Sequence, residues 1–203
     1  MDSEPEQFDI ELVNSLLGNR IVPAQMDCVD NPTDITDYIF KNEPVWEEYD
    51  FDPTWKYPFW NVNRFGMTHT KFDEMDIYIG GEHEDYYDPN FHIYNDIIVI
   101  KGNVRIYSYP MEVFPPTDFH CAMKVGDYIW IIGNNGYPKY RSLEIQVCRL
   151  HVPTMKMEKI SPLGDVPPWT SFYGNQLTLE NNFIKIKDNS WIFDTTSFTF
   201  SSC

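Results

Sequence analysis

The stretch IYIGGEHEDYYDPNFHIYNDIIVI, residues 77–100, combines two kinds of sequence. Its ends, Ile77–Ile79 and Asp96–Ile100, are rich in β-branched and aromatic residues, which favour β-strands. Gly80 and Gly81 follow the first run, and glycine tolerates the backbone conformations with which a chain leaves a strand. The stretch therefore predicts two strands joined by a long polar loop.

Strand-like apolar runs separated by polar or turn residues continue to the end of the sequence. From Arg64 onward, short apolar runs alternate with turn residues, as in NVRIYSY, YIWIIG, LEIQVCRL, FIKI, WIFD and FTF. This pattern predicts a mainly β domain over residues 64–203. Residues 1–63 differ in composition, and Ser3-x-x-Glu6 resembles a capping box ahead of a helical apolar pattern over residues 5–17. We therefore expect a short helical N-terminal extension.

An internal repeat divides the β domain. The segment FPPTDF ends at Phe119 and VPPWTSF ends at Phe172, a spacing of 53 residues, while a weaker copy, YPFWNVNRF, ends at Phe65, 54 residues before Phe119. A period near 50 residues with about four strands per unit is typical of propeller blades. The units predicted from these spacings are about 64–113, 114–168 and 169–203.

These residues resemble the kelch-repeat β-propeller family. The resemblance rests on Ile77–Gly81, a strand followed by a double glycine, on Gly126–Asn134, in which Gly133 takes the place of the first glycine, and on Val147–Ile160, which is similar to the outer strand pair of a blade. It covers residues 64–203. The resemblance implies a partial kelch-like propeller of about three four-stranded antiparallel blades, with Gly80, Gly81 and Gly133 as structural turn residues.

Three blades fall short of the four to eight that close a propeller, and an open fan would leave sheet edges unpaired. We expect the extension 1–63, with Trp46, Trp55 and Trp60, to cap the domain. The alternative is a homodimer through an open blade edge.

The loop after Gly81 carries the strongest candidate site. Tyrosine is enriched at protein interfaces, and loops on rigid scaffolds commonly hold binding residues. We therefore expect the loop to contact a partner protein rather than a metal, because it offers one histidine near its acids and no cysteine. The predicted partner-binding residues are Glu82, His83, Glu84, Asp85, Tyr86, Tyr87, Asp88 and Phe91.

The charge of the chain narrows the choice of partners. The net charge is −16, of which residues 1–60 contribute 14 acids against 3 bases (−11) and residues 61–203 contribute 17 against 12 (−5). Such a chain should repel nucleic acids and anionic membranes and attract a basic protein surface. The four cysteines form no CxxC pair and no apolar run is long enough to span a membrane, so we expect a cytoplasmic protein.

Motifs of catalysis are absent from the sequence. It has no G-x-S-x-G elbow, no H-E-x-x-H pair and no phosphate-binding glycine loop, so we expect no catalytic residues and no cofactor. The favoured function is a protein-interaction module. One alternative is an acidic inhibitor or immunity-type protein that neutralises a basic enzyme such as a nuclease. A second alternative is a metal-dependent enzyme that uses the His83 loop.

Overall fold

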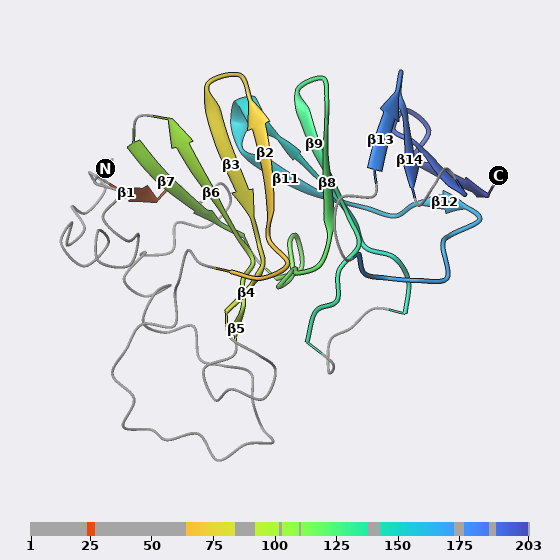
Figure 1. Cartoon of the computed structure of the whole chain (residues 1–203), viewed down its shortest axis with the longest axis horizontal. Coiled ribbons are helices and arrows are strands. Elements are labelled where there is room, and N and C mark those ends of the chain that lie inside the picture. Colours follow the sequence, from red (N-terminus) through yellow and green to blue (C-terminus); the bar gives the residue numbers. More distant parts are fainter. Residues whose placement is uncertain are drawn as a thin grey trace, which may run out of the picture.

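The computed structural model describes residues 64–83, 92–101, 103–109, 111–137, 143–172, 177–186 and 190–202, together with the backbone of 24–26. Within these ranges the protein is mainly β, as the sequence predicts. Three larger antiparallel sheets follow one another along the chain and across the molecule (Figure 1). The predicted helix at 5–17 and the tryptophan-rich segment lie outside the described residues.

Sheet 1 contains four antiparallel strands in chain order and a fifth, parallel strand at one edge. The antiparallel strands are β2 (Thr68–Phe72), β3 (Met75–Ile79), β6 (Asp96–Lys101) and β7 (Asn103–Ser108). Strand β1 (Ala24–Met26) pairs in parallel with β7. A separate ladder of β4 (Glu82–His83) and β5 (His92–Ile93) stands at the base of the long loop between β3 and β6.

Sheet 2 contains four antiparallel strands in the same succession. These are β8 (Cys121–Val125), β9 (Tyr128–Ile132), β10 (Val147–His151) and β11 (Lys156–Ile160). A single 3₁₀ turn, η2 (Val152–Thr154), connects β10 to β11. Strand β11 forms the outer edge of this sheet, and its charged residues Lys156, Glu158 and Lys159 discourage pairing with another chain.

Sheet 3 repeats the pattern of sheet 1, including the fifth strand. Its antiparallel strands are β13 (Leu177–Glu180), β14 (Phe183–Ile186), β15 (Trp191–Asp194) and β16 (Thr199–Ser202). Strand β12 (Leu163–Gly164), which precedes this sheet in the chain, pairs in parallel with β16. The fifth strands of sheets 1 and 3 are an addition to the four per unit that the sequence predicts.

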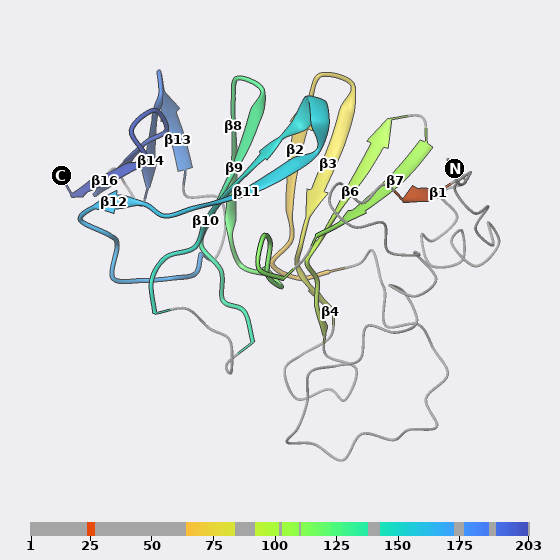
Figure 2. The same cartoon turned by 180° about the vertical axis from the view of Figure 1, so that it is seen from behind.

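The first strands of the three sheets are neighbours, because β8 contacts β2 on one side and β13 on the other. The hairpins β2–β3 and β8–β9 point the same way, whereas β4 and β5 project from the opposite end of sheet 1 (Figures 1 and 2). The molecule therefore has a hairpin end and a loop end. The loop end is where the long β3–β6 and β9–β10 connections begin and finish.

Hydrogen bonds between the sheets give the repeat its register. The amide of Phe172 donates to the carbonyl of Phe119 (2.6 Å), and the amide of Phe119 donates to the carbonyl of Gly66 (2.9 Å). Equivalent positions are therefore 53 residues apart in both steps, since 172 − 119 and 119 − 66 give the same spacing. The equivalent of Phe119 is Gly66, not Phe65 as the sequence spacing of 54 suggests, and the Phe65 side chain is exposed.

Two apolar clusters join the sheets in pairs. The first lies between sheets 1 and 2, and the second lies between sheets 2 and 3, where Trp130 packs edge-on against Phe193 at 5.2 Å. The first cluster includes Phe72, Ile77, Ile79, Ile97, Val99, Phe114, Ile129, Ile131, Cys148 and Leu150. The second includes Trp130, Ile132, Val147, Phe172, Ile184, Ile186, Phe193 and Phe200. Sheet 2 is therefore covered on both faces.

The two end sheets differ in their outer faces. In sheet 1, Tyr78, Ile98 and Ile106 lie in register on the face away from sheet 2, and Ile98 and Ile106 are fully buried. In sheet 3, the outer face carries six polar residues and two apolar ones. These are Thr178, Glu180, Phe183, Lys185, Ile192, Asp194, Thr199 and Ser201. The outer face of sheet 3 is thus suited to contact with water.

Candidate functional site

Gly80 and Gly81, at the loop end, follow β3, where the chain leaves sheet 1 for the long β3–β6 connection. The amide of Gly80 donates to the Asp96 carbonyl (3.0 Å), and the amide of Gly81 donates to the Thr117 carbonyl (2.8 Å). Gly80 and Gly81 have φ values of 54° and 93°, and a Cβ on Gly80 would lie 2.1 Å from the Thr117 oxygen. A side chain would therefore collide with backbone, which explains why glycine occupies this turn.

Sheet 2 repeats this turn with its own partners. The amide of Gly133 donates to the Gln146 carbonyl (2.8 Å), and the amide of Asn134 donates to the Thr170 carbonyl (2.5 Å). Gly133 has φ 90°, and a Cβ there would lie 2.5 Å from the Phe172 ring. The second position can be asparagine because Asn134, unlike Gly81, does not have a positive φ. Its side chain takes part in the polar contacts described below.

The candidate interaction loop is held at its base by backbone pairing. Phe65 and Glu82 exchange two hydrogen bonds of 2.8 Å, and the Gly81 carbonyl accepts from the Tyr94 amide at 2.9 Å. The amide of Ile93, in β5, donates to the hydroxyl of Tyr137 at 2.7 Å, which links β5 to the β9–β10 connection of sheet 2. The loop therefore leaves and re-enters a rigid framework.

The predicted contact residues divide into two groups. Glu82 and His83 form β4, which pairs with β5 at the base of the loop. Phe65, which is not among the predicted contact residues, lies beside Glu82 with 61% of its surface exposed. The remaining predicted residues, Glu84, Asp85, Tyr86, Tyr87, Asp88 and Phe91, lie outside the described residues.

A buried ion pair occupies the corner of sheet 1 where the loop begins. The Arg64 guanidinium binds both carboxylate oxygens of Asp96, one of them at 3.0 Å, and donates to the Gly80 carbonyl at 3.1 Å. The Tyr94 ring lies 3.5 Å from the guanidinium carbon. Both charged side chains are almost completely buried. Such a pair tolerates burial only because each partner neutralises and hydrogen-bonds the other.

The corresponding corner of sheet 2 is neutral. Thr117 lies 53 residues after Arg64, and Gln146 has the backbone role of Asp96, since its carbonyl accepts from the glycine of the turn. The Gln146 amide donates to the Thr117 hydroxyl at 2.9 Å, and Asn134 donates to the Gln146 side-chain oxygen at 3.1 Å. A neutral hydrogen-bonded set thus replaces the ion pair at the equivalent position.

Two further polar residues lie in the buried boundary between sheets 1 and 2. Asp118 accepts a hydrogen bond of 2.6 Å from the Gly136 amide, and its own amide donates to the Asn134 side-chain oxygen at 3.1 Å. His120 contacts the Thr68 hydroxyl through Nε2 at 2.8 Å, while its Nδ1 is buried without a hydrogen-bond partner. These contacts fix the loop end of the two sheets to each other.

The titration behaviour of these groups indicates structure rather than acid–base chemistry. Burial lowers the pKa of His120 to about 3, so the imidazole is neutral near pH 7. Burial, together with the charge of Asp118 and Glu82, raises the pKa of Tyr137 despite the Ile93 hydrogen bond. Burial also raises the pKa of the Cys148 thiol to about 12, which leaves it protonated and unreactive. These are not the values of a general base or an activated nucleophile at neutral pH.

Within the described ranges, no group of three or more His, Cys, Asp or Glu side chains is arranged to hold a metal ion. The same residues contain no helix of the length and apolarity needed to cross a membrane. No protein-family model matches this chain, and no curated protein matches it.

The sequence did not point to the side chains of the two buried corners. Arg64, Asp96, Thr117 and Gln146 are distant in sequence and became candidates only when the fold brought them together. One signal was present, because Thr117 and Thr170 occupy matching places in the two Pro-Pro segments.

Proposed function

We propose that this chain is a protein-interaction module: a partial kelch-like propeller of about three blades whose loop 82–91 binds another protein. The observation that carries the proposal is the base of that loop. The β4–β5 ladder projects from the loop end, away from the hairpins (Figure 1), and an exposed Phe65 lies beside Glu82. A large exposed aromatic side chain next to a rigidly anchored loop is the arrangement that interface anchors use.

The partner in this proposal has a basic surface. The chain carries a net charge of −16, and the loop sequence EHEDYYD, residues 82–88, contains four acids. Complementary charge would speed association and make binding weaken as ionic strength rises. In the alternative form of this proposal, the partner is a basic enzyme, and the protein acts as its acidic inhibitor.

Site-specific photo-crosslinking tests the proposal. With p-benzoylphenylalanine in place of Phe65, full-length protein in native cell extract should crosslink to one recurring protein. Placing the same group at Phe183, an exposed aromatic on the outer face of sheet 3, provides the matched control. Replacing Tyr86 and Tyr87 with alanine should reduce the Phe65 product severalfold, while His83→Ala should leave it unchanged.

Two results would contradict the proposal. One is equal crosslinking from Phe65 and Phe183, which would mean that the loop end has no preferred partner. The other is stoichiometric metal in purified protein that His83→Ala removes, which would favour the metal-dependent enzyme instead.

The blade arrangement also requires that the outer face of sheet 1 be covered. Ile98 and Ile106 on this face are fully buried, whereas the outer face of sheet 3 is polar. In the proposed arrangement, the extension 1–63 caps this face. Deleting residues 1–63 should then expose apolar surface, raise the binding of a hydrophobic dye and cause aggregation. A truncated chain that stays soluble, monomeric and equally heat-resistant would exclude the cap, and a soluble truncated dimer would favour pairing between two copies.

A further inference from the structure

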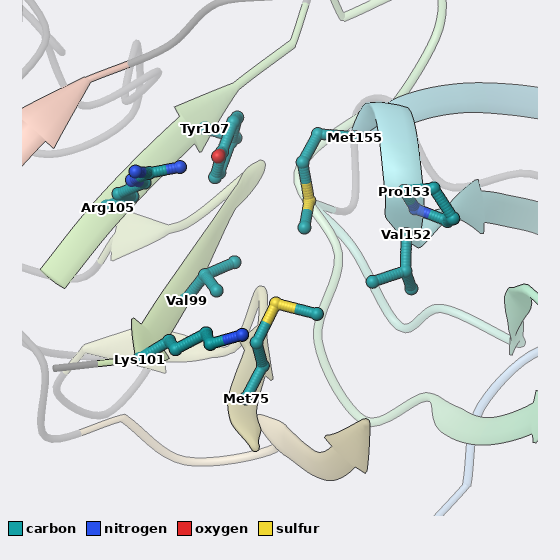
Figure 3. Close-up of a pocket in the computed structure, with 8 residues that line it drawn as sticks. All are labelled: Met75, Val99, Lys101, Arg105, Tyr107, Val152, Pro153 and Met155. Carbon is teal, nitrogen blue, oxygen red and sulfur yellow. The ribbon is translucent and has the colours of Figure 1, made fainter. Parts of the chain in front are cut away.

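A pocket opens between sheets 1 and 2, away from the candidate interaction loop and without a residue in common with it. Its volume is about 230 Å³. One wall comes from sheet 1 and the other from the η2 turn that joins β10 to β11 (Figure 3). The residues that line it are Met75, Val99, Lys101, Arg105, Tyr107, Val152, Pro153 and Met155.

The wall formed by the η2 turn is fixed in place by hydrogen bonds. The Tyr109 hydroxyl of sheet 1 donates to the Met155 carbonyl at 2.7 Å, and the Met155 amide donates to the Val152 carbonyl at 3.3 Å. The amide of Val152 donates to the Asp127 carbonyl at 3.0 Å. Val152 and Met155 are themselves buried. The η2 wall of the pocket is therefore held in a fixed position against sheet 1.

The apolar part of the lining is adaptable. Met75 and Met155 lie on opposite sides of the pocket in Figure 3, with Val99 on the sheet 1 wall between them. Methionine side chains are flexible and polarisable, so they adjust to ligands of differing shape and contact aromatic rings favourably.

Two cations accompany this apolar lining. Lys101 extends toward Met75 and Arg105 toward Tyr107, so both lie along the sheet 1 wall, opposite Val152 and Pro153 (Figure 3). Lys101 has one ion pair, an exposed contact of 3.5 Å with Glu74, which solvent weakens. Arg105 has no ion pair or hydrogen bond from its side chain to any residue among those described. None of the described residues that line the pocket is an acid.

We propose that this pocket binds a small organic carboxylate with an apolar body, of about the size of an arylalkanoic acid. In a chain with a net charge of −16, two cations beside an apolar recess, with no acid among its described lining residues, are complementary to an anion. The arginine fork binds a carboxylate through two hydrogen bonds, and the methionines and valines cover the apolar body.

The volume favours a free small molecule over a protein segment. The volume of the pocket is about 230 Å³. That space suits one ring and a short chain, and it is smaller than the usual range for drug-sized ligands.

Titration of the full-length protein with 4-phenylbutyrate tests this proposal, with its neutral amide, 4-phenylbutanamide, as the matched ligand. The acid should bind saturably and at least fivefold more tightly than the amide. In protein labelled with ¹³C at the methionine methyl groups, the signals of Met75 and Met155 should shift. The signal of Met111, which is exposed and does not line the pocket, should not shift.

Charge variants test whether Lys101 and Arg105 bind the carboxylate. The double substitution Lys101→Gln, Arg105→Gln should weaken binding of the acid roughly tenfold and leave the amide unaffected, because the lost hydrogen bonds are charge-assisted. Lys71→Gln is the control, since Lys71 is an exposed cation on the opposite face of the same sheet. It should change the affinity less than twofold.

Three results would overturn the proposal. They are the absence of saturable binding by the folded full-length chain at about 10 mM acid, equal affinity for the acid and the amide, or equal affinity of the double variant and the parent protein. The first of these is also the outcome expected if an acidic segment of the chain itself fills the pocket. None of them depends on the crosslinking at Phe65, so the two proposals can fail separately.

Discussion

Sheets 1 and 2 use the same backbone turn but stabilise it with different side chains. In sheet 1 the turn glycine bonds to Asp96, whose carboxylate is paired with Arg64; in sheet 2 it bonds to Gln146, whose amide binds Thr117. The chain from the turn glycine to the residue that accepts its hydrogen bond is also three residues longer in sheet 1 than in sheet 2, because 96 − 80 is 16 and 146 − 133 is 13. The comparison teaches that the repeat specifies backbone geometry, while the chemistry of each corner varies.

The difference has an energetic consequence. A buried ion pair contributes little relative to a well-packed neutral pair, but loss of one partner leaves an uncompensated charge in the interior. A neutral hydrogen-bonded pair carries no such penalty. The corner of sheet 1 should therefore be far more sensitive to single substitutions than the corner of sheet 2.

The largest expected effect is that of Asp96→Ala. It leaves Arg64 buried without a counter-charge and should lower the free energy of unfolding by about 3–5 kcal/mol at pH 7. Denaturant unfolding followed by circular dichroism measures it. Asp127→Ala, at an exposed hairpin position, is the control and should stay within about 0.5 kcal/mol of the parent. A loss below about 1 kcal/mol for Asp96→Ala would remove the distinction between the corners.

Transplanting the neutral pair sharpens the same test. The double variant Arg64→Thr, Asp96→Gln places the residue types of sheet 2 in sheet 1 and leaves no unpaired charge. It should be less destabilised than Asp96→Ala alone, even though it loses the contact of Arg64 with Tyr94. A double variant as unstable as the single one would show that the packing of Arg64, not its charge, stabilises the corner.

Acid should weaken the boundary between sheets 1 and 2. The pKa of His120 is about 3 in the folded protein and 6.5 without burial, so the folded state binds fewer protons. Its contribution to stability is present above pH 6.5 and is lost as the pH falls toward 3. Between pH 6.5 and pH 5 the loss is about 1.6 kcal/mol, because the slope rises to 1.36 kcal/mol per pH unit only once the unfolded histidine is fully protonated. In His120→Gln the dependence on pH over this interval should be smaller by that amount; identical profiles would contradict the assignment.

Gln146→Ala should have a smaller effect. It removes the hydrogen bonds to Thr117 and Asn134 but leaves no charge behind, and Thr117 and Asn134 retain bonds to the Pro115 and Pro116 carbonyls. We expect a loss of about 1–2 kcal/mol in the same unfolding assay. A loss equal to that of Asp96→Ala would mean that the neutral corner is as sensitive as the charged one.

The smallest effect is expected on the outer face of sheet 3, which serves as the baseline for both corners. Phe183 lies there, 43% exposed among mostly polar neighbours. Phe183→Ser should change the free energy of unfolding by no more than about 0.5 kcal/mol. A loss above about 2 kcal/mol would show that this face is covered in solution, against its polar composition.

Much of the architecture follows from local sequence. Alternating β-branched and aromatic runs indicated the antiparallel strands, and the Pro-Pro segments ending at Phe119 and Phe172 gave the spacing that the inter-sheet hydrogen bonds also show. These features could be predicted because strand propensity and turn chemistry depend on residues a few positions apart. The kelch resemblance, the partner and the role of the 82–91 loop remain proposals.

Tertiary structure decided the rest. Only the folded chain shows that Gly66 rather than Phe65 is the equivalent of Phe119, that β1 and β12 add parallel strands, and that Arg64 meets Asp96 across 32 residues. The pocket between sheets 1 and 2 likewise joins residues as far apart as Met75 and Met155. Sequence alone gives the strands and their period, because these are local; which side chains share a buried corner depends on sheet packing, and one residue of register changes every such pairing.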